Sequence, residues 1–188
     1  MKTQIRRCVF ETNSSSIHTL SIVKDANLKV VPEKVVFEPD EFGWEHRSYT
    51  KTSKKASYIW ECIKSIYDQD HENFLRAIEK IQKFLYTYNI KCEFPYANVQ
   101  VKSWTGSDGK VYSYNEYVND AGIKDSGYVD HAWDARPFIN DILNDETKFI
   151  NFLFDPRSFI ITGNDNDDDY AESPDTGGAD AWEYCKGN

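Results

Sequence analysis

Residues 53–89 have the sequence SKKASYIWECIKSIYDQDHENFLRAIEKIQKFLYTYN, and this stretch decides the fold. Apolar side chains recur in it at intervals of three and four residues, both before and after Asp70. That spacing gathers them on one face of an α-helix. Ser53 and Asp70 can each cap a helix start, and Asn89 can adopt the left-handed conformation that ends a helix. The stretch therefore predicts two consecutive amphipathic helices.

Segments that alternate apolar and polar residues precede these helices. Residues 5–10 and 17–23 alternate with a period of two, which is typical of half-buried strands. The polar residues 11–16 between them favour a tight turn, because their side chains hydrogen-bond nearby backbone. Residues 28–31 and 35–37 predict a hairpin with Pro32 in its turn.

The second half of the chain predicts further short elements. Residues 99–104 and 110–114 predict a hairpin, in which glycine supplies the positive φ of the turn at residues 105–109. Asp134 is predicted to cap a helix with Pro137 in its first turn, and Asp145 to open another that ends at Asp155-Pro156. A last strand at residues 158–162 is predicted to join the sheet of residues 5–10 and 17–23.

These elements predict one α+β domain over residues 1–162. Its mostly antiparallel sheet packs against two longer amphipathic helices and shorter C-terminal helices. An acidic C-terminal segment, residues 163–188, follows and is expected to be partly ordered or packed on the domain. A chain of 188 residues is long enough to bury a core of this kind without disulfides or metals.

Composition narrows the class of protein. No apolar run approaches the roughly 18 residues of a membrane span, and the first residues lack the apolar region of a signal peptide. We therefore expect a cytoplasmic protein without membrane contacts. The four cysteines have no C-x-x-C spacing, so we expect free thiols and no zinc site at Cys8, Cys62, Cys92 and Cys185.

The net charge of −9 is concentrated at the C-terminal end. Residues 163–188 hold eight acids and one lysine, a charge of −7, which leaves −2 for the rest of the chain. Phosphate backbones are repelled by such a segment, so direct nucleic-acid binding by the acidic tail is disfavoured.

Residues 6–20, RRCVFETNSSSIHTL, resemble the N-terminal signature of a family of uncharacterised proteins from phages and mobile elements of Firmicutes-like bacteria. Residues 127–131 (GYVDH) and 162–166 (TGNDN) are similar to later segments of the same family. Cys8 stands where the family usually has glycine, and Ala132-Trp133 replaces a polar pair, which weakens a catalytic role for the preceding Asp-His. The resemblance implies a bacterial host cell, where proteins of this kind often act against host defences, including as inhibitors of CRISPR nucleases.

The polar residues around the signature suggest a possible site with mixed hydrogen-bond donors and acceptors. Serine beside histidine can form a nucleophile, but no G-x-S-x-G frame surrounds these serines, so a structural turn is the preferred interpretation. A ligand site and a structural hydrogen-bond network both stay open for this set, which contains Arg6, Glu11, Asn13, Ser15, His18, Asp130 and His131.

Carboxylates near Asp130 and in the tail can in principle hold a divalent metal. Asp165, Asp167 and Asp169 imitate the start of a calcium loop, but Tyr170 replaces its glycine and Thr176 its bidentate glutamate. An EF-hand is excluded, and no metal, cofactor or catalytic residue is predicted.

Three functions compete at this level, of which the least specific is a structural or accessory protein of a phage whose signature residues merely hold the strands together. In the first, the protein acts by binding a host protein with a basic nucleic-acid-binding surface, such as a CRISPR nuclease. The binding residues predicted for it are Asp165, Asp167, Asp168, Asp169, Tyr170 and Trp182, although such a tail can also be a merely solvated segment. In the second, the protein is a small metal-dependent or nucleotide-acting enzyme that uses the polar set with Asp130 and His131.

Overall fold

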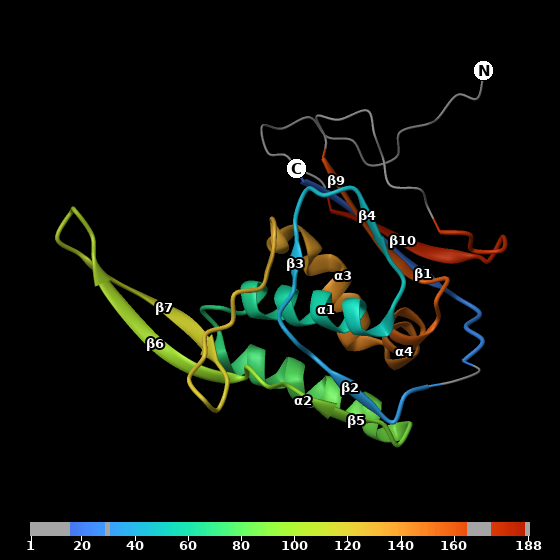
Figure 1. Cartoon of the computed structure of the whole chain (residues 1–188), viewed down its shortest axis with the longest axis horizontal. Helices are drawn as coiled ribbons and strands as arrows, with labels where there is room; N and C mark the ends of the chain where they lie inside the picture. The colour runs from blue at the N-terminus through green and yellow to red at the C-terminus, as the bar shows by residue number, and fades with distance from the viewer. Residues whose placement is uncertain (1–15, 29–30, 165–173, 187–188) are drawn as a thin grey trace.

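Helix α1, Thr52–Ile66, lies at the centre of the computed structural model, which describes residues 16–28, 31–164 and 174–186 (Figure 1). The main sheet lies on one side of α1, and α2, His71–Thr87, on the other. Eleven of the fifteen residues of α1 are buried, among them Lys55, Glu61 and Lys64. The helix is therefore enclosed on more sides than the single apolar face of its sequence predicts.

The main sheet is antiparallel and has the order β10–β1–β9–β4. Its strands are β1, Ser16–Val23; β4, Arg47–Tyr49; β9, Phe159–Asn164; and β10, Ala181–Lys186. The pairing of β1 with β9 confirms that residues 17–23 and 158–162 share one sheet. Residues 5–10, the third predicted member, lie outside the described residues.

Local capping signals placed most helix ends correctly. The side chain of Asp70 accepts a hydrogen bond from the Asn73 backbone N at 3.1 Å, and Asn89 has φ 56°, as predicted. Asp145 caps α4, Glu146–Phe154, by accepting from the Lys148 backbone N at 3.1 Å. Pro137 stands in the first turn of α3, Arg136–Asn144.

Two predicted caps are wrong. Helix α1 begins one residue before Ser53, with Lys51 as its N-cap and without a side-chain hydrogen bond there. Asp134 lies inside the short 3₁₀ helix η1, Ala132–Ala135, which begins after His131 in a left-handed conformation. The tight turn at His131 starts the helical path earlier than the aspartate signal indicates.

The hairpin predicted for residues 28–31 and 35–37 falls partly on residues 29–30, which lie outside the described residues, but the structure gives its second strand another partner. Strand β2, Lys34–Val36, pairs in parallel with β5, Lys91–Glu93. Phe37, which follows β2, stacks on Phe94 with ring centroids 4.5 Å apart, so aromatic packing between distant segments favours this pairing. A second short parallel pair joins β3, Glu41–Phe42, to β8, Tyr128–Val129.

Strands β6, Asn98–Thr105, and β7, Val111–Val118, form the predicted second hairpin. Gly109 supplies the positive φ of its turn, at 77°. The hairpin projects from the body of the molecule as a long arm (Figure 1).

The helices and strands other than this hairpin surround one hydrophobic core. The chain therefore forms a single α+β domain. Within the described part of the chain, no helix is long and apolar enough to cross a membrane. Cys92 is a free thiol, as predicted.

Candidate functional site

Three parts of the chain meet near the loop after β3: residues 16–20, 127–131 and 162–164. In the sheet, His18 of β1 lies opposite Thr162 of β9. The His18 Nε2 atom lies 3.1 Å from the Gly43 carbonyl oxygen, and the Asp130 backbone N donates to the Phe42 carbonyl oxygen at 2.9 Å. The last residue of β3 and the first loop residue after it therefore contact residues 127–131 and β1, respectively.

His18 is fully buried and hydrogen-bonded through both ring nitrogens. Besides its contact with Gly43, its Nδ1 atom lies 3.1 Å from the Tyr58 hydroxyl oxygen on α1. These contacts join β1 to α1 and to the loop after β3, so they suit a residue that holds elements together. The other N-terminal members of the predicted polar set lie outside the described residues: Arg6, Glu11, Asn13 and Ser15.

Asp130 and His131 lie next to this loop and are partly exposed. His131 Nε2 is 3.5 Å from Asp130 Oδ1. The ring nitrogens of His18 bond Tyr58 and Gly43 rather than this pair. Among the residues that the structure describes, no three histidine, cysteine or acidic side chains converge on a point where they could hold a metal ion.

Of the predicted binding residues in the tail, only Trp182 falls within the described part of the chain; Asp165, Asp167, Asp168, Asp169 and Tyr170 do not. Trp182 is half-buried on β10 and packs against the core. Lys24 Nζ lies 5.6 Å and Lys148 Nζ 4.9 Å from its ring centroid. The ring is thus engaged by two cations of its own domain.

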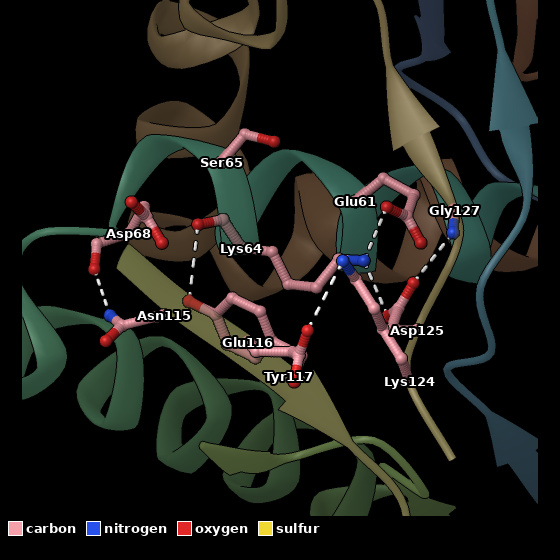
Figure 2. Close-up of a pocket in the computed structure, with 10 residues that line it drawn as sticks. All are labelled: Glu61, Lys64, Ser65, Asp68, Asn115, Glu116, Tyr117, Lys124, Asp125 and Gly127. Carbon is pink, nitrogen blue, oxygen red and sulfur yellow. Dashed lines mark hydrogen bonds and ion pairs between the residues drawn. The ribbon is translucent and has the colours of Figure 1, made fainter. Parts of the chain in front are cut away.

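A polar cavity of about 340 Å³ opens between α1, β7 and the segment that leads to β8 (Figure 2). Lys64 Nζ lies 2.7 Å from Glu61 Oε2 and 2.5 Å from Asp125 Oδ2. All three side chains are almost fully buried. Two carboxylates therefore share one lysine at the wall of the cavity.

The two carboxylates differ in their other partners. Asp125 accepts further hydrogen bonds from Trp60 Nε1 and from the Gly127 backbone N, both at 2.8 Å. Among the described residues, Glu61 receives one further hydrogen bond, a long one of 3.4 Å from the Asp40 backbone N. Burial raises the pKa of Glu61 to about 7; Lys64 opposes this rise and Asp125 adds to it. Glu61 can therefore exchange a proton near neutral pH.

This cluster was not predicted from the sequence, although a signal for it is present there. Glu61 and Lys64 interrupt the apolar pattern of the first helix at a spacing of three residues. Charged side chains within an apolar face indicate a buried ion pair. Asp125 had no comparable signal, because it comes from a distant loop.

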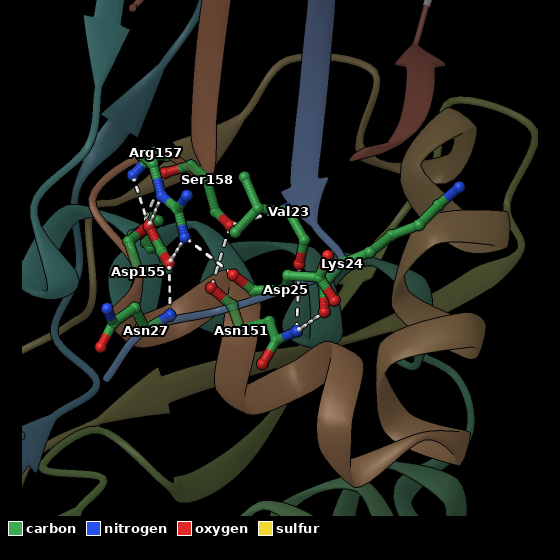
Figure 3. A network of polar contacts seen from close by, with 9 residues as sticks. Val23, Lys24, Asp25, Asn27, Asn151, Asp155, Arg157 and Ser158 are labelled. Atoms are coloured by element: carbon green, nitrogen blue, oxygen red, sulfur yellow. Dashed lines mark hydrogen bonds and ion pairs between the residues drawn. The ribbon is translucent and has the colours of Figure 1, made fainter. Parts of the chain in front are cut away.

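A network of polar contacts closes the end of β1 (Figure 3). A second buried lysine, Lys55, contacts two residues of this network. Its Nζ donates to the carbonyl oxygens of Asp155, at 2.8 Å, and Ser158, at 3.1 Å. Burial lowers the pKa of Lys55 to about 7, against the attraction of Asp155. Asn151 Nδ2 donates to the Val23 and Lys24 carbonyl oxygens, both at 3.0 Å. The network provides hydrogen-bond donors for backbone carbonyl groups at the end of β1 and between α4 and β9, so its role is structural.

The hairpin arm exposes large apolar side chains. Trp104 and Tyr112 stack across the strands with ring centroids 5.0 Å apart, and 55% of Trp104 stays exposed. Val101 and Val111 are each more than 70% exposed. Little of this arm is buried beyond its base.

Comparisons with protein-family models, with curated proteins and with solved structures find no match for this chain.

Proposed function

We propose that this protein acts by binding another protein, and that the β6–β7 hairpin is its principal contact. The observation that carries the proposal is the exposure of Trp104, Tyr112 and the two valines on an arm that leaves the body. Because these side chains are exposed, they contribute little to the stability of the fold itself. Exposed aromatic side chains of this kind are frequent centres of binding energy in protein interfaces.

The backbone of the arm supports the same proposal. In the part of the chain that the structure describes, β6 and β7 form a sheet of two strands. Their outer edges near the tip carry backbone groups that a strand of a partner can pair with. An isolated two-stranded hairpin is marginally stable, so a partner would also fix its conformation.

For the partner we propose a nucleic-acid-processing protein of a bacterial host's defences, such as a CRISPR nuclease, met in the host cytoplasm. The resemblance of residues 6–20 to a phage and mobile-element family supports this identity. The net charge of −9 supports it as well, because an acidic surface is attracted to a groove that binds phosphates.

The test compares hairpin variants with a matched variant elsewhere. Trp104→Ala and Tyr112→Ala should each raise the dissociation constant for a purified partner nuclease by about tenfold or more, measured by surface plasmon resonance. Tyr86→Ala, at an exposed aromatic residue of α2, should bind as the unchanged protein does. Hairpin variants that fold and bind normally would contradict the role of the arm.

A second candidate function is a small enzyme that uses the cavity of Figure 2. Glu61, with its pKa near 7, favours it as a proton donor or acceptor. Four carboxylates and two lysines line the cavity, so a neutral or cationic substrate fits it better than a nucleotide phosphate. A compound that raises the melting temperature of the unchanged protein, but not of Glu61→Gln, would support this candidate.

A further inference from the structure

A small cavity of about 250 Å³ lies beside the β3–β8 pair, lined by Gly43, Trp44, Tyr128 and Asp130. Its two aromatic residues are largely accessible, Trp44 being 58% and Tyr128 44% exposed. The parallel pairing of β3 with β8, together with the bond from the Asp130 backbone N to the Phe42 carbonyl oxygen, fixes the opposite walls. The cavity is thus an open site on a firm backbone frame.

Gly43 keeps the cavity open because it has no side chain. A Cβ atom at this position would lie 3.2 Å from the Tyr128 hydroxyl oxygen and 3.7 Å from Glu45 Oε2. The phenol and this carboxylate therefore face the same point. The loop is held from behind by two bonds, His18 Nε2 to the Gly43 carbonyl oxygen and Thr162 Oγ1 to the Glu45 carbonyl oxygen.

The charges around the cavity are negative. Burial first, and then the carboxylates of Glu45, Glu41 and Asp130, raise the pKa of the Tyr128 hydroxyl. The Glu45 Oε2 atom is buried and accepts no hydrogen bond from the residues that the structure describes. A buried carboxylate oxygen without a donor is costly, and a ligand with N–H groups would satisfy it.

We propose that this cavity takes up an arginine side chain of the partner protein. A guanidinium group is planar and stacks on aromatic rings, so it suits a cavity lined by Trp44 and Tyr128. Its several N–H donors can reach more than one carboxylate at once, here Glu45 and Asp130. The inference rests on the proposed binding function and adds to it a second contact, separate from the hairpin arm.

The experiment titrates ¹⁵N-labelled protein with Nα-acetyl-arginine amide and follows the indole N–H signal of Trp44. Nα-acetyl-citrulline amide is the matched control probe, because it keeps the shape of arginine and lacks its charge. We expect saturable shifts at Trp44 with the arginine probe and at least fivefold weaker binding of the citrulline probe. Trp44→Ala, which removes one cation–π contact, should weaken arginine binding about two- to fivefold, measured in this variant from the backbone N–H signal of Gly43.

Two further variants separate this site from the hairpin. Glu45→Gln should also weaken arginine binding, whereas Trp104→Ala, at an equally exposed tryptophan of the arm, should leave it unchanged. Equal binding of both probes, or shifts confined to other residues, would overturn the inference even if the hairpin binds a partner. Arginine binding at Trp44 would support the inference even if the hairpin variants bind the nuclease normally. That second result would contradict only the proposed role of the hairpin.

Discussion

Replacing Lys64 by methionine should destabilise the protein strongly, because two buried carboxylates would lose their shared cation. Glu61 and Asp125 are 1% and 2% exposed, so water cannot replace the ammonium group. Breaking a buried ion pair by removing one partner costs about 3–5 kcal/mol. Domains of this size are stable by about 5–15 kcal/mol, so the loss is a large fraction of the total.

The destabilisation should depend on pH in a definite direction. The pKa of Glu61 is about 7 in the folded protein and 4.5 as its ordinary value, so folding favours the protonated carboxyl. The stability that the raised pKa of Glu61 contributes is fully present below about pH 4.5 and is lost as the pH rises through about 7. Without Lys64, which lowers this pKa, Glu61 holds its proton to higher pH. The penalty in the Lys64→Met variant should therefore be smaller at about pH 5.5 than at about pH 8.

Urea unfolding followed by tryptophan fluorescence measures both effects. Lys34→Met is the matched control, because Lys34 pairs with Glu93 at the surface, where both side chains are about half exposed. That variant should lose no more than about 1 kcal/mol. If Lys64→Met loses as little as Lys34→Met, or loses the same amount at both pH values, the buried cluster does not stabilise the fold as argued.

Three further changes test other parts of the molecule. His18→Ala should lower the free energy of unfolding by about 1–3 kcal/mol, because the Tyr58 hydroxyl and the Gly43 carbonyl lose a buried partner; an unchanged urea midpoint would argue against this role. Gly127→Ala should cost about 1–3 kcal/mol in the same assay, since its Cβ would lie 2.6 Å from the Asp40 backbone N and would press on Glu61 Oε1; a stable variant would show that the loop can shift. The third change exchanges four aspartates of the acidic tail for asparagine: Asp165, Asp167, Asp168 and Asp169. If the tail meets a basic partner, this variant should associate more slowly and with a weaker dependence on salt, measured as association rates at two ionic strengths. Unchanged rates would mean that the tail is merely a solvated segment.

Sequence alone located the elements whose signals are local. Asp70 and Asp145 cap their helices by hydrogen bonds to backbone three residues on, and Gly109 supplies the positive φ of a turn between adjacent strands. Ser53 and Asp134 gave the same kind of signal and failed, because neighbouring residues had already entered a helical path. A capping residue permits a helix start without excluding the positions beside it.

The candidate sites depended on contacts that no local pattern contains. The cluster at Lys64 needs Asp125 from a distant loop, and the cavity at Gly43 needs the parallel pairing of β3 with β8. The hairpin shows the limit most clearly. Its alternation of valine, tryptophan and tyrosine predicts the two strands equally well whether they are buried or exposed. The sequence by itself determined the α+β class, the two long helices and this hairpin, because each follows from neighbours along the chain. Only the tertiary structure decided that the arm leaves the core and that α1 encloses charged groups, because burial depends on which distant segments pack against a residue.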